Sequence, residues 1–183
     1  MENTKWILDQ AHSELFFKVK HLMITNVRGE FQNFDIVVDA NGDDFDNAKV
    51  SATADVESVF TKQKDRDNHL KGEDFFDAAN HPQLKFESTS VVKLDAHNYK
   101  LSGDLTIRGA VKEVVLDVEF GGVVNDPVSG HTKAGFTING KINRGDWGLT
   151  YNAALESGGV LLSDEVRITA EIQLIKEEAE KAA

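Results

Sequence analysis

Apolar and polar residues alternate with a period of two along most of this chain. From Ser13 to His21, every second side chain lies on one face of an extended strand; these residues are Ser13, Leu15, Phe17, Val19 and His21. The residues between them, such as Glu14 and Lys18, lie on the other face. This pattern predicts a strand with one buried face and one solvated face. It returns in residues 29–38, 50–56, 84–88, 99–107, 114–120, 134–142 and 166–174.

These segments predict an all-β protein of about eight antiparallel strands, because short, turn-rich connections join most of them. Such strands form either a closed barrel or a sandwich, and the period alone does not distinguish the two. Small residues recur on the predicted inner faces; they are Ser13, Ala52, Ala54, Ser88, Gly103, Ala134, Gly140 and Ala170. They favour a barrel that encloses space, because a densely packed core needs bulkier side chains. The alternative is that they make room for large neighbours, such as Phe86 and Phe136, in a tight core.

One polar segment interrupts the strands. Residues 61–77 form a charged run that ends in the adjacent Phe75 and Phe76. Its residues permit a helix, and we expect a short helical segment near residues 62–80 at one end of the barrel. Residues 175–183 favour a helix but have no apolar face, so they are predicted to be a flexible or helical tail.

Composition narrows the classes of partner. The 183 residues suffice for one domain, which we take to span residues 1–183. A formal net charge of −11 disfavours nucleic acid, which binds to clustered Lys and Arg. No apolar run approaches the roughly 20 residues that span a bilayer, so stable membrane insertion is not expected. The opening MENTKW lacks the pattern of an export signal. A cytoplasmic location is therefore expected, or a periplasmic one if the chain is a trimmed mature form.

The interrupting segment also concentrates side chains suited to chemistry. Arg66, Asp67 and His69 lie within four residues, and a carboxylate beside an imidazole can serve acid–base catalysis. No nucleophile motif accompanies them, and the chain has no cysteine. We therefore expect no catalytic residues, and we expect Arg66 and Asp67 to fasten this segment to neighbouring loops. The six histidines show no zinc-binding spacing, so neither a metal nor another cofactor is predicted.

Motifs spread over nearly the whole chain resemble those of one family in their order and spacing. They are Trp-x-Leu-Asp-x-x-His-Ser-x-x-x-Phe-x-Val-x-His from Trp6 to His21; Val27-x-Gly29-x-Phe31; Ser58 with Thr61; Arg66-Asp67-x-His69-Leu70-Lys71 with Asp74-Phe75-Phe76-Asp77; His81-Pro82-x-Leu84-x-Phe86-x-Ser88-Thr89; Gly103-x-Leu105-Thr106-Ile107-Arg108-Gly109; and Asn143-Arg144-x-Asp146-Trp147-Gly148. The set resembles the YceI-like family of lipocalin-like proteins.

The resemblance implies an extended antiparallel β-barrel around an elongated apolar cavity, which in this family holds a polyisoprenoid or a similar long-chain lipid. It also implies a homodimer. Burying each CH2 group contributes about 0.8 kcal/mol, so a narrow apolar tunnel binds such a chain with few polar contacts. The expected function is non-catalytic binding, storage or transport of a long-chain isoprenoid, polyprenyl or quinone-like.

The residues expected to contact the lipid form two groups. His21, Arg66 and His69 are expected to meet a polar headgroup at the wetter end. The cavity wall is expected to include Leu15, Phe17, Val19, Phe31, Ala52, Phe75, Phe76, Phe86, Leu105, Phe136 and Trp147.

Two other classes of function compete with lipid binding. An enzyme or chaperone-like protein would act on a hydrophobic lipid, with Asp67 and His69 as the catalytic pair. An interaction scaffold would instead bind another protein through its dimer surface or its acidic loops.

Overall fold

The alternating segments fold into antiparallel β-strands in the computed structural model, which describes residues 2–178. The strands are β1 (Asn3–Leu8), β2 (Glu14–His21), β3 (Thr25–Phe31), β4 (Phe34–Asn41), β5 (Asp44–Asp55), β6 (Val59–Phe60), β7 (Gln83–Lys93), β8 (Asn98–Ile107), β9 (Ala110–Asn125), β10 (Thr132–Asn143) and β11 (Leu162–Lys176). The helix is α1 (Lys64–Lys71), and the 3-10 turns are η1 (Gln10–His12), η2 (Val56–Ser58) and η3 (Arg144–Trp147).

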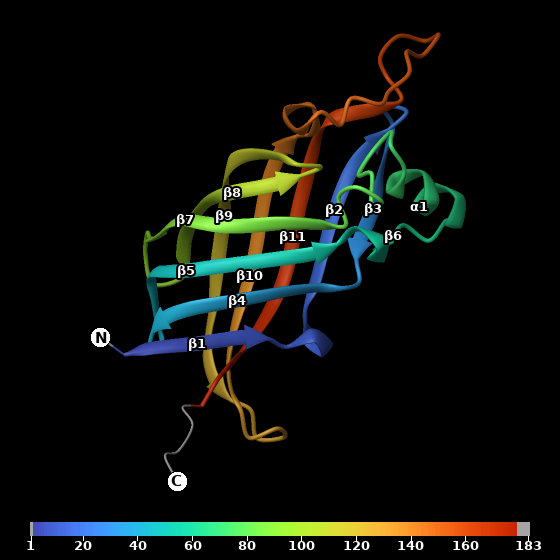
Figure 1. Ribbon diagram of the computed structural model, residues 1–183. Coiled ribbons are helices and arrows are strands. Elements are labelled where there is room, and N and C mark those ends of the chain that lie inside the picture. Colours follow the sequence, from blue (N-terminus) through green and yellow to red (C-terminus); the bar gives the residue numbers. More distant parts are fainter. Residues whose placement is uncertain (1, 179–183) are drawn as a thin grey trace.

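The sheet closes into a barrel. Its strand order is β1-β4-β5-β7-β8-β9-β10-β11, and β11 pairs back with β1 to complete an antiparallel ring. The closing ladder places Leu8 of β1 opposite Leu174 of β11. Figure 1 shows β4, β5, β7 and β8 crossing β9, β10 and β11 at a steep angle, which gives the barrel two facing walls. The prediction of an all-β, eight-stranded antiparallel barrel is confirmed.

Three further strands extend the ring at one end. The long β11 pairs with β1 through its last residues and with β2 through residues between Leu162 and Glu171. β3 pairs with β2 as β4 pairs with β1, and β6 pairs with β3 as β5 pairs with β4. β1 with β2, β3 with β4, and β5 with β6 thus act as three long strands, each interrupted along its length. The eight predicted segments correspond to the eight lengthwise strands.

The structure adds one strand to the prediction and divides another, and several predicted strands are longer. Sequence reasoning missed β1, although Thr4, Trp6 and Leu8 are buried and alternate with exposed residues. The predicted strand at 29–38 is two strands, because a two-residue bend separates β3 from β4. The break lets β3 pair with β6 while β4 pairs with β5.

The predicted tail starts too early. Ile175 and Lys176 belong to β11, where they pair with Ile7 and Trp6 of β1 and help to close the barrel. Burial against β1 thus extends the strand past the point where the apolar alternation ends. The rest of the predicted tail, residues 179–183, lies outside the described residues.

The predicted helical segment is confirmed over α1, and turns follow it. The helix begins after Gln63, whose Oε1 accepts a hydrogen bond from Arg66 N at 2.5 Å and so caps the first turn. Gly72 ends the helix, and none of its residues is buried. Figure 1 shows α1 beside β3 and β6, at the end of the barrel away from β1. Within residues 2–178, no helix is both long and apolar enough to cross a membrane.

The small inward residues serve both purposes considered above. Gly103 and Gly140 make room for large neighbours, because a Cβ at Gly103 would collide with the ring of Phe86 and one at Gly140 with the side chain of Leu116. The alanines differ, because Ala52, Ala54 and Ala170 line an internal cavity. The tight-core interpretation therefore holds at the two glycines, and the open-barrel interpretation holds at the alanines.

Aromatic side chains fill the end of the barrel at β1. Trp6 is fully buried and packs against Phe45 with ring centroids 5.2 Å apart. Phe45 in turn contacts Phe136 and Phe120, at centroid distances of 5.0 Å and 5.5 Å. The indole Nε1 of Trp6 donates a hydrogen bond to Gly42 O at 3.1 Å, so the buried nitrogen is satisfied. These rings close this end of the barrel.

An ionic cluster braces the same region. Lys133 Nζ lies 2.8 Å from Asp9 Oδ2 and 3.1 Å from Asp126 Oδ2, and it links the start of β10 to the end of β1. Burial acts to raise the pKa of Asp9, but hydrogen bonds from Lys133 and His12 outweigh it and lower that pKa. Hydrogen bonds from Val128 N and from Lys133 hold the pKa of Asp126 well below its usual range. Both carboxylates are therefore ionised at neutral pH.

Candidate ligand-binding cavity

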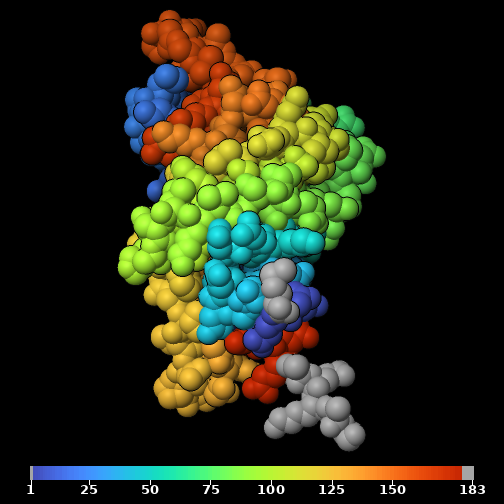
Figure 2. Space-filling model, turned by 90° about the vertical axis from the view of Figure 1, so that its left-hand side faces the viewer, coloured from blue at the N-terminus to red at the C-terminus, as the bar shows by residue number. Residues whose placement is uncertain are grey.

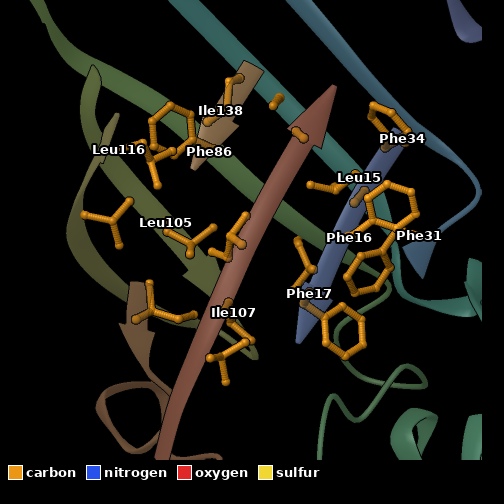
Figure 3. A pocket seen from close by; sticks show the side chains of 18 of the residues that line it. Leu15, Phe16, Phe17, Phe31, Phe34, Phe86, Leu105, Ile107, Leu116 and Ile138 are labelled. Carbon is orange, nitrogen blue, oxygen red and sulfur yellow. The ribbon is translucent and has the colours of Figure 1, made fainter. Parts of the chain in front are cut away.

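The barrel encloses a cavity of about 470 Å³, and nearly all of its wall is apolar. Its volume lies within the range of small-molecule sites, about 300–1,000 Å³. The two crossing walls of the barrel both contribute side chains, which point into the space between them (Figure 3). Those labelled in the figure include Leu15, Phe17, Phe31, Phe86, Leu105, Leu116 and Ile138. A wall of this kind suits an apolar ligand, which needs few hydrogen-bond partners.

All but one of the residues predicted to contact the lipid lie on the cavity wall. They are Leu15, Phe17, Val19, His21, Phe31, Ala52, Arg66, His69, Phe75, Phe76, Phe86, Leu105 and Phe136. The exception is Trp147, which is buried in η3 and does not line the cavity. Its Nε1 donates a hydrogen bond to Leu105 O at 2.8 Å, so the ring packs within the wall, against the backbone of β8. Contact of the other residues with a ligand stays a prediction.

The predicted residues reach the closed end of the cavity at Phe136, which packs against Phe45, but they leave out other parts of its wall. Toward the closed end the cavity is also lined by Val38, Phe45, Tyr99 and Leu174. The alternation places Tyr99 and Leu174 on inner faces, but it gives no measure of depth. The rings around Phe45 set the depth of the cavity. Their position depends on how the two walls of the barrel cross, which the alternation does not show.

The other end of the cavity reaches the surface beside α1. The exposed residues of its lining include Arg66, His69 and Tyr151. The His69 ring lies 5.0 Å from the Phe75 ring and 4.9 Å from the Tyr151 ring, and Phe75 and Tyr151 lie 5.2 Å apart, all measured between centroids. These three rings form an aromatic cluster where the cavity meets solvent, and we call this end the mouth.

Arg66 and Asp67 hold α1 at the mouth. The Arg66 guanidinium donates hydrogen bonds from Nε to Thr61 Oγ1 at 2.8 Å and from Nη2 to Thr61 O at 2.6 Å. Asp67 Oδ1 accepts a hydrogen bond from Thr61 N at 2.8 Å. Both residues therefore tie the helix to Thr61, the first residue of the same polar segment. These bonds fold the segment back on itself and do not reach the neighbouring loops to which the sequence predicts that they fasten it.

His69 does not form the pair that acid–base catalysis would require. Asp67 is engaged by Thr61, and His69 Nε2 instead lies 2.9 Å from Asp74 Oδ2. The side chains of His69 and Asp74 are 42% and 56% exposed, so water screens their interaction. The hypothesis of an enzyme acting through Asp67 and His69 loses the geometry on which it depends. Among the described residues, His, Asp and Glu side chains do not gather in groups of three that could hold a metal ion.

Sequence reasoning did not identify Arg144 as a site residue, although one of the motifs contains it. Arg144 lines the cavity, and only 4% of its surface is exposed. Its Nε donates to Ser163 O at 2.9 Å, and its Nη1 donates to Leu149 O at 2.6 Å and to Tyr151 O at 2.9 Å. Burial lowers the pKa of Arg144, and the charge of Asp164 offsets part of that effect. Arg144 thus positions the chain between η3 and β11 and places a buried cation near the mouth.

Comparisons with known sequences identify relatives along nearly the whole chain. The family model described as "YceI-like domain" matches residues 6–174. UPF0312 protein SA2479 of Staphylococcus aureus is 42% identical over 167 residues, which cover 91% of this chain and 95% of that protein.

Solved structures share the barrel. The Campylobacter jejuni YCEI protein is 37% identical, with a TM-score of 0.76, and the match covers 93% of this chain and 97% of that one. A polyisoprenoid binding domain from Saccharophagus degradans is 15% identical, with a TM-score of 0.62, and the match covers 94% of this chain and 98% of that one. At 15% identity the likeness shows the fold alone.

Proposed function

The chain belongs to the YceI-like family, and on this premise we propose that it binds a long-chain isoprenoid lipid, polyprenyl or quinone-like, without changing it chemically. The observation that carries the proposal is the apolar cavity of about 470 Å³ inside the barrel. A relative with the same fold is named a polyisoprenoid binding domain, which supports the class of ligand.

The two ends of the cavity suggest how such a lipid lies. Its tail would pass between the facing walls toward Phe45, because each buried CH2 group contributes about 0.8 kcal/mol. A polar head would lie at the mouth, near the His69 ring and the positive charge of Arg144.

Mass spectrometry of the purified protein tests this proposal. We expect a native spectrum that shows one non-covalent ligand per cavity, and solvent extraction that releases a compound with the repeating fragments of an isoprenoid. The Ala52→Phe variant, prepared in the same way, should yield less of that compound. Extraction of a straight-chain fatty acid, or of no lipid at all, would overturn the isoprenoid assignment.

Assembly, exchange and location complete the proposal. The family resemblance supports a homodimer, which light scattering coupled to size exclusion would detect as twice the mass of one chain. Storage and transport differ in whether bound lipid exchanges, so transfer of labelled lipid from the protein to acceptor vesicles separates them. The expected cytoplasmic location stays a prediction, which cell fractionation tests.

A further inference from the structure

The hairpin between β2 and β3 carries apolar side chains at its exposed tip. Leu22, Met23 and Ile24 are 38%, 49% and 76% exposed, and we call these three residues the apolar tip. Ile24 N donates a hydrogen bond to His21 O at 3.1 Å, so the chain reverses over these four residues. The two central residues, Leu22 and Met23, have φ angles of 54° and 64°. Two successive positive φ angles are characteristic of a type I′ turn.

Turn chemistry does not explain the residues at this position. A type I′ turn strongly prefers Asn-Gly, because both central residues adopt positive φ. Leu22 and Met23 adopt that conformation at a steric cost, and both stay substantially exposed. Leu22 and Met23 thus violate the residue preference of the turn, and they are not fully buried to offset the steric cost. Such a violation indicates that the side chains serve a function.

A second segment of low charge lies beside the apolar tip. Leu22 N donates a hydrogen bond to Leu161 O at 2.8 Å, and a Cβ at Gly159 would lie 3.1 Å from Met23 Cγ. Residues 150–163, which contain both of these neighbours, carry only one charged side chain. Figure 1 and Figure 2 both show the blue β2–β3 turn and this orange-red loop at the same end of the molecule. They form one surface with little charge.

The apolar tip adjoins the mouth of the cavity. His21, the residue before the tip, lines the cavity, and so do Leu161 and Tyr151 of the neighbouring loop. A lipid that leaves the cavity at the mouth therefore meets the tip and this loop next.

The hairpin is also locally basic. Its exposed Lys18, Lys20 and Arg28 lie on the half nearer the tip, whereas its two carboxylates, Glu14 and Glu30, lie at the far ends of β2 and β3. The chain as a whole has a net charge of −11, so the half of the hairpin nearer the tip is opposite in sign to the chain. The guanidinium of Arg28 lies 3.5 Å from the centroid of the Phe16 ring, so it covers that ring while its charge stays at the surface.

The neighbouring loop and the start of β11 carry three carboxylates, and one of them is paired. Glu156 is the single charged residue of the neighbouring loop. Asp164 and Glu165 lie near the start of β11, and Glu165 pairs with Arg167 at 3.6 Å and with Lys141 at 3.8 Å. Apolar side chains at the tip, with lysines behind them, form the arrangement that binds the interface of an anionic membrane.

We propose that the apolar tip inserts into the interfacial layer of an anionic lipid bilayer and brings the mouth of the cavity against the membrane surface. The purpose of this contact rests on the proposed function, because lipid would pass directly between the bilayer and the cavity. The contact itself requires only the tip and the basic residues behind it. It is peripheral, because the inserting surface is a single turn.

The proposal is tested by measuring the vesicle binding of a variant whose turn has lost its apolar side chains. The double substitution Leu22→Asn with Met23→Gly gives the turn its preferred sequence, so the fold should be retained while two apolar side chains are lost. We expect the unaltered protein to co-sediment with phosphatidylcholine vesicles that contain phosphatidylglycerol. The double variant should bind them about tenfold more weakly or worse, with an unchanged or raised unfolding midpoint.

Val128 offers a matched control. Its side chain is 94% exposed in the β9–β10 turn, at the end of the molecule opposite the tip (Figures 1 and 2), so Val128→Asn should leave vesicle binding unchanged. Lys18→Gln combined with Lys20→Gln should reduce the preference for anionic over neutral vesicles. Equal binding by the double turn variant, or no binding by the unaltered protein, would overturn the proposal.

Two further outcomes separate the proposal from its alternatives. If the tip contacts a second copy of the chain, the double variant will change the sedimentation coefficient without changing vesicle binding, and membrane docking is overturned. Lipid extraction from the same preparations keeps the two hypotheses apart. Vesicle binding without any extracted cargo overturns only the proposed function, whereas cargo without vesicle binding overturns only membrane docking.

Discussion

Filling the cavity at Ala52 should block ligand binding without unfolding the barrel. Ala52 lies in β5, opposite Ile36 of β4 and Phe86 of β7, and its half-buried side chain faces the cavity. In Ala52→Phe the new ring would occupy space that holds no protein atoms, so overpacking should be small. The folded state without ligand should therefore keep its stability or gain some from the added apolar contacts.

The loss of affinity follows from the volume that the ring takes. If the ring displaces about four CH2 groups of the ligand at about 0.8 kcal/mol each, the lost binding free energy is about 3 kcal/mol. That loss weakens affinity on the order of a hundredfold. A lipid long enough to fill the cavity cannot avoid the ring by sliding, because the rings around Phe45 close the far end.

The same substitution at Ala134 serves as the control for this prediction. Ala134 also lies on an inner face, but it is 1% exposed, lies within the packed core and does not line the cavity. Ala134→Phe should therefore destabilise the fold by about 1–3 kcal/mol or more through overpacking. The same substitution is thus expected to give opposite results at two inward alanines.

Two measurements on each variant decide the matter. Urea unfolding of delipidated protein gives the free energy of unfolding, and displacement of a fluorescent polyprenyl probe gives the affinity. The reasoning is refuted if Ala52→Phe unfolds as readily as Ala134→Phe, or if it binds the probe as tightly as the unaltered protein.

Three other changes have defined outcomes. Gly103→Ala should lower the free energy of unfolding by about 1–3 kcal/mol, because the added Cβ meets the Phe86 ring and lies 2.5 Å from Glu87 O; urea titration checks this. The depressed pKa values of Asp9 and Asp126 stabilise the fold above about pH 4, and this stability is lost as the pH falls toward their folded-state values. Lys133→Met should lower stability at pH 7 and flatten its acid dependence below about pH 4, and parallel stability curves would contradict this. Arg66→Ala should speed amide hydrogen exchange in α1 and leave the barrel strands protected, which exchange mass spectrometry resolves.

The strands could be predicted from the sequence because each has one buried face. A period of two is the direct result of that burial, so it identifies the lengthwise strands of the barrel. The breaks within them could not be read in the same way. The bend between β3 and β4 is fixed by the different partners of those strands, β6 and β5, and this pairing is a property of the folded sheet.

The sequence predicted which side chains point into the barrel but not how they pack there. Ala52 and Gly103 carry the same signal, a small residue on an inner face, yet one borders empty space and the other lies against a phenylalanine ring. The difference depends on how the Phe86 side chain crosses from its strand to the next. Side-chain type also gave the wrong prediction at two other residues. Trp147 was predicted to line the cavity, but its indole nitrogen bonds within the wall. Arg144 was not predicted to line the cavity, because it is a cation, but it does.

The two ends of the barrel differ in what holds them, and this difference gives the cavity a direction. The end at β1 is filled by aromatic rings in tilted and edge-to-face contact and braced by Lys133 between two carboxylates, so opening it would expose apolar surface and separate the buried Lys133 from Asp9. The mouth is held by hydrogen bonds such as those from Arg66 to Thr61, which water can replace at small cost, and by an aromatic cluster in which His69 and Tyr151 are already exposed. A lipid would therefore enter and leave beside α1. Because the apolar tip lies at this same end, a membrane that binds the tip faces the part of the barrel that opens most easily.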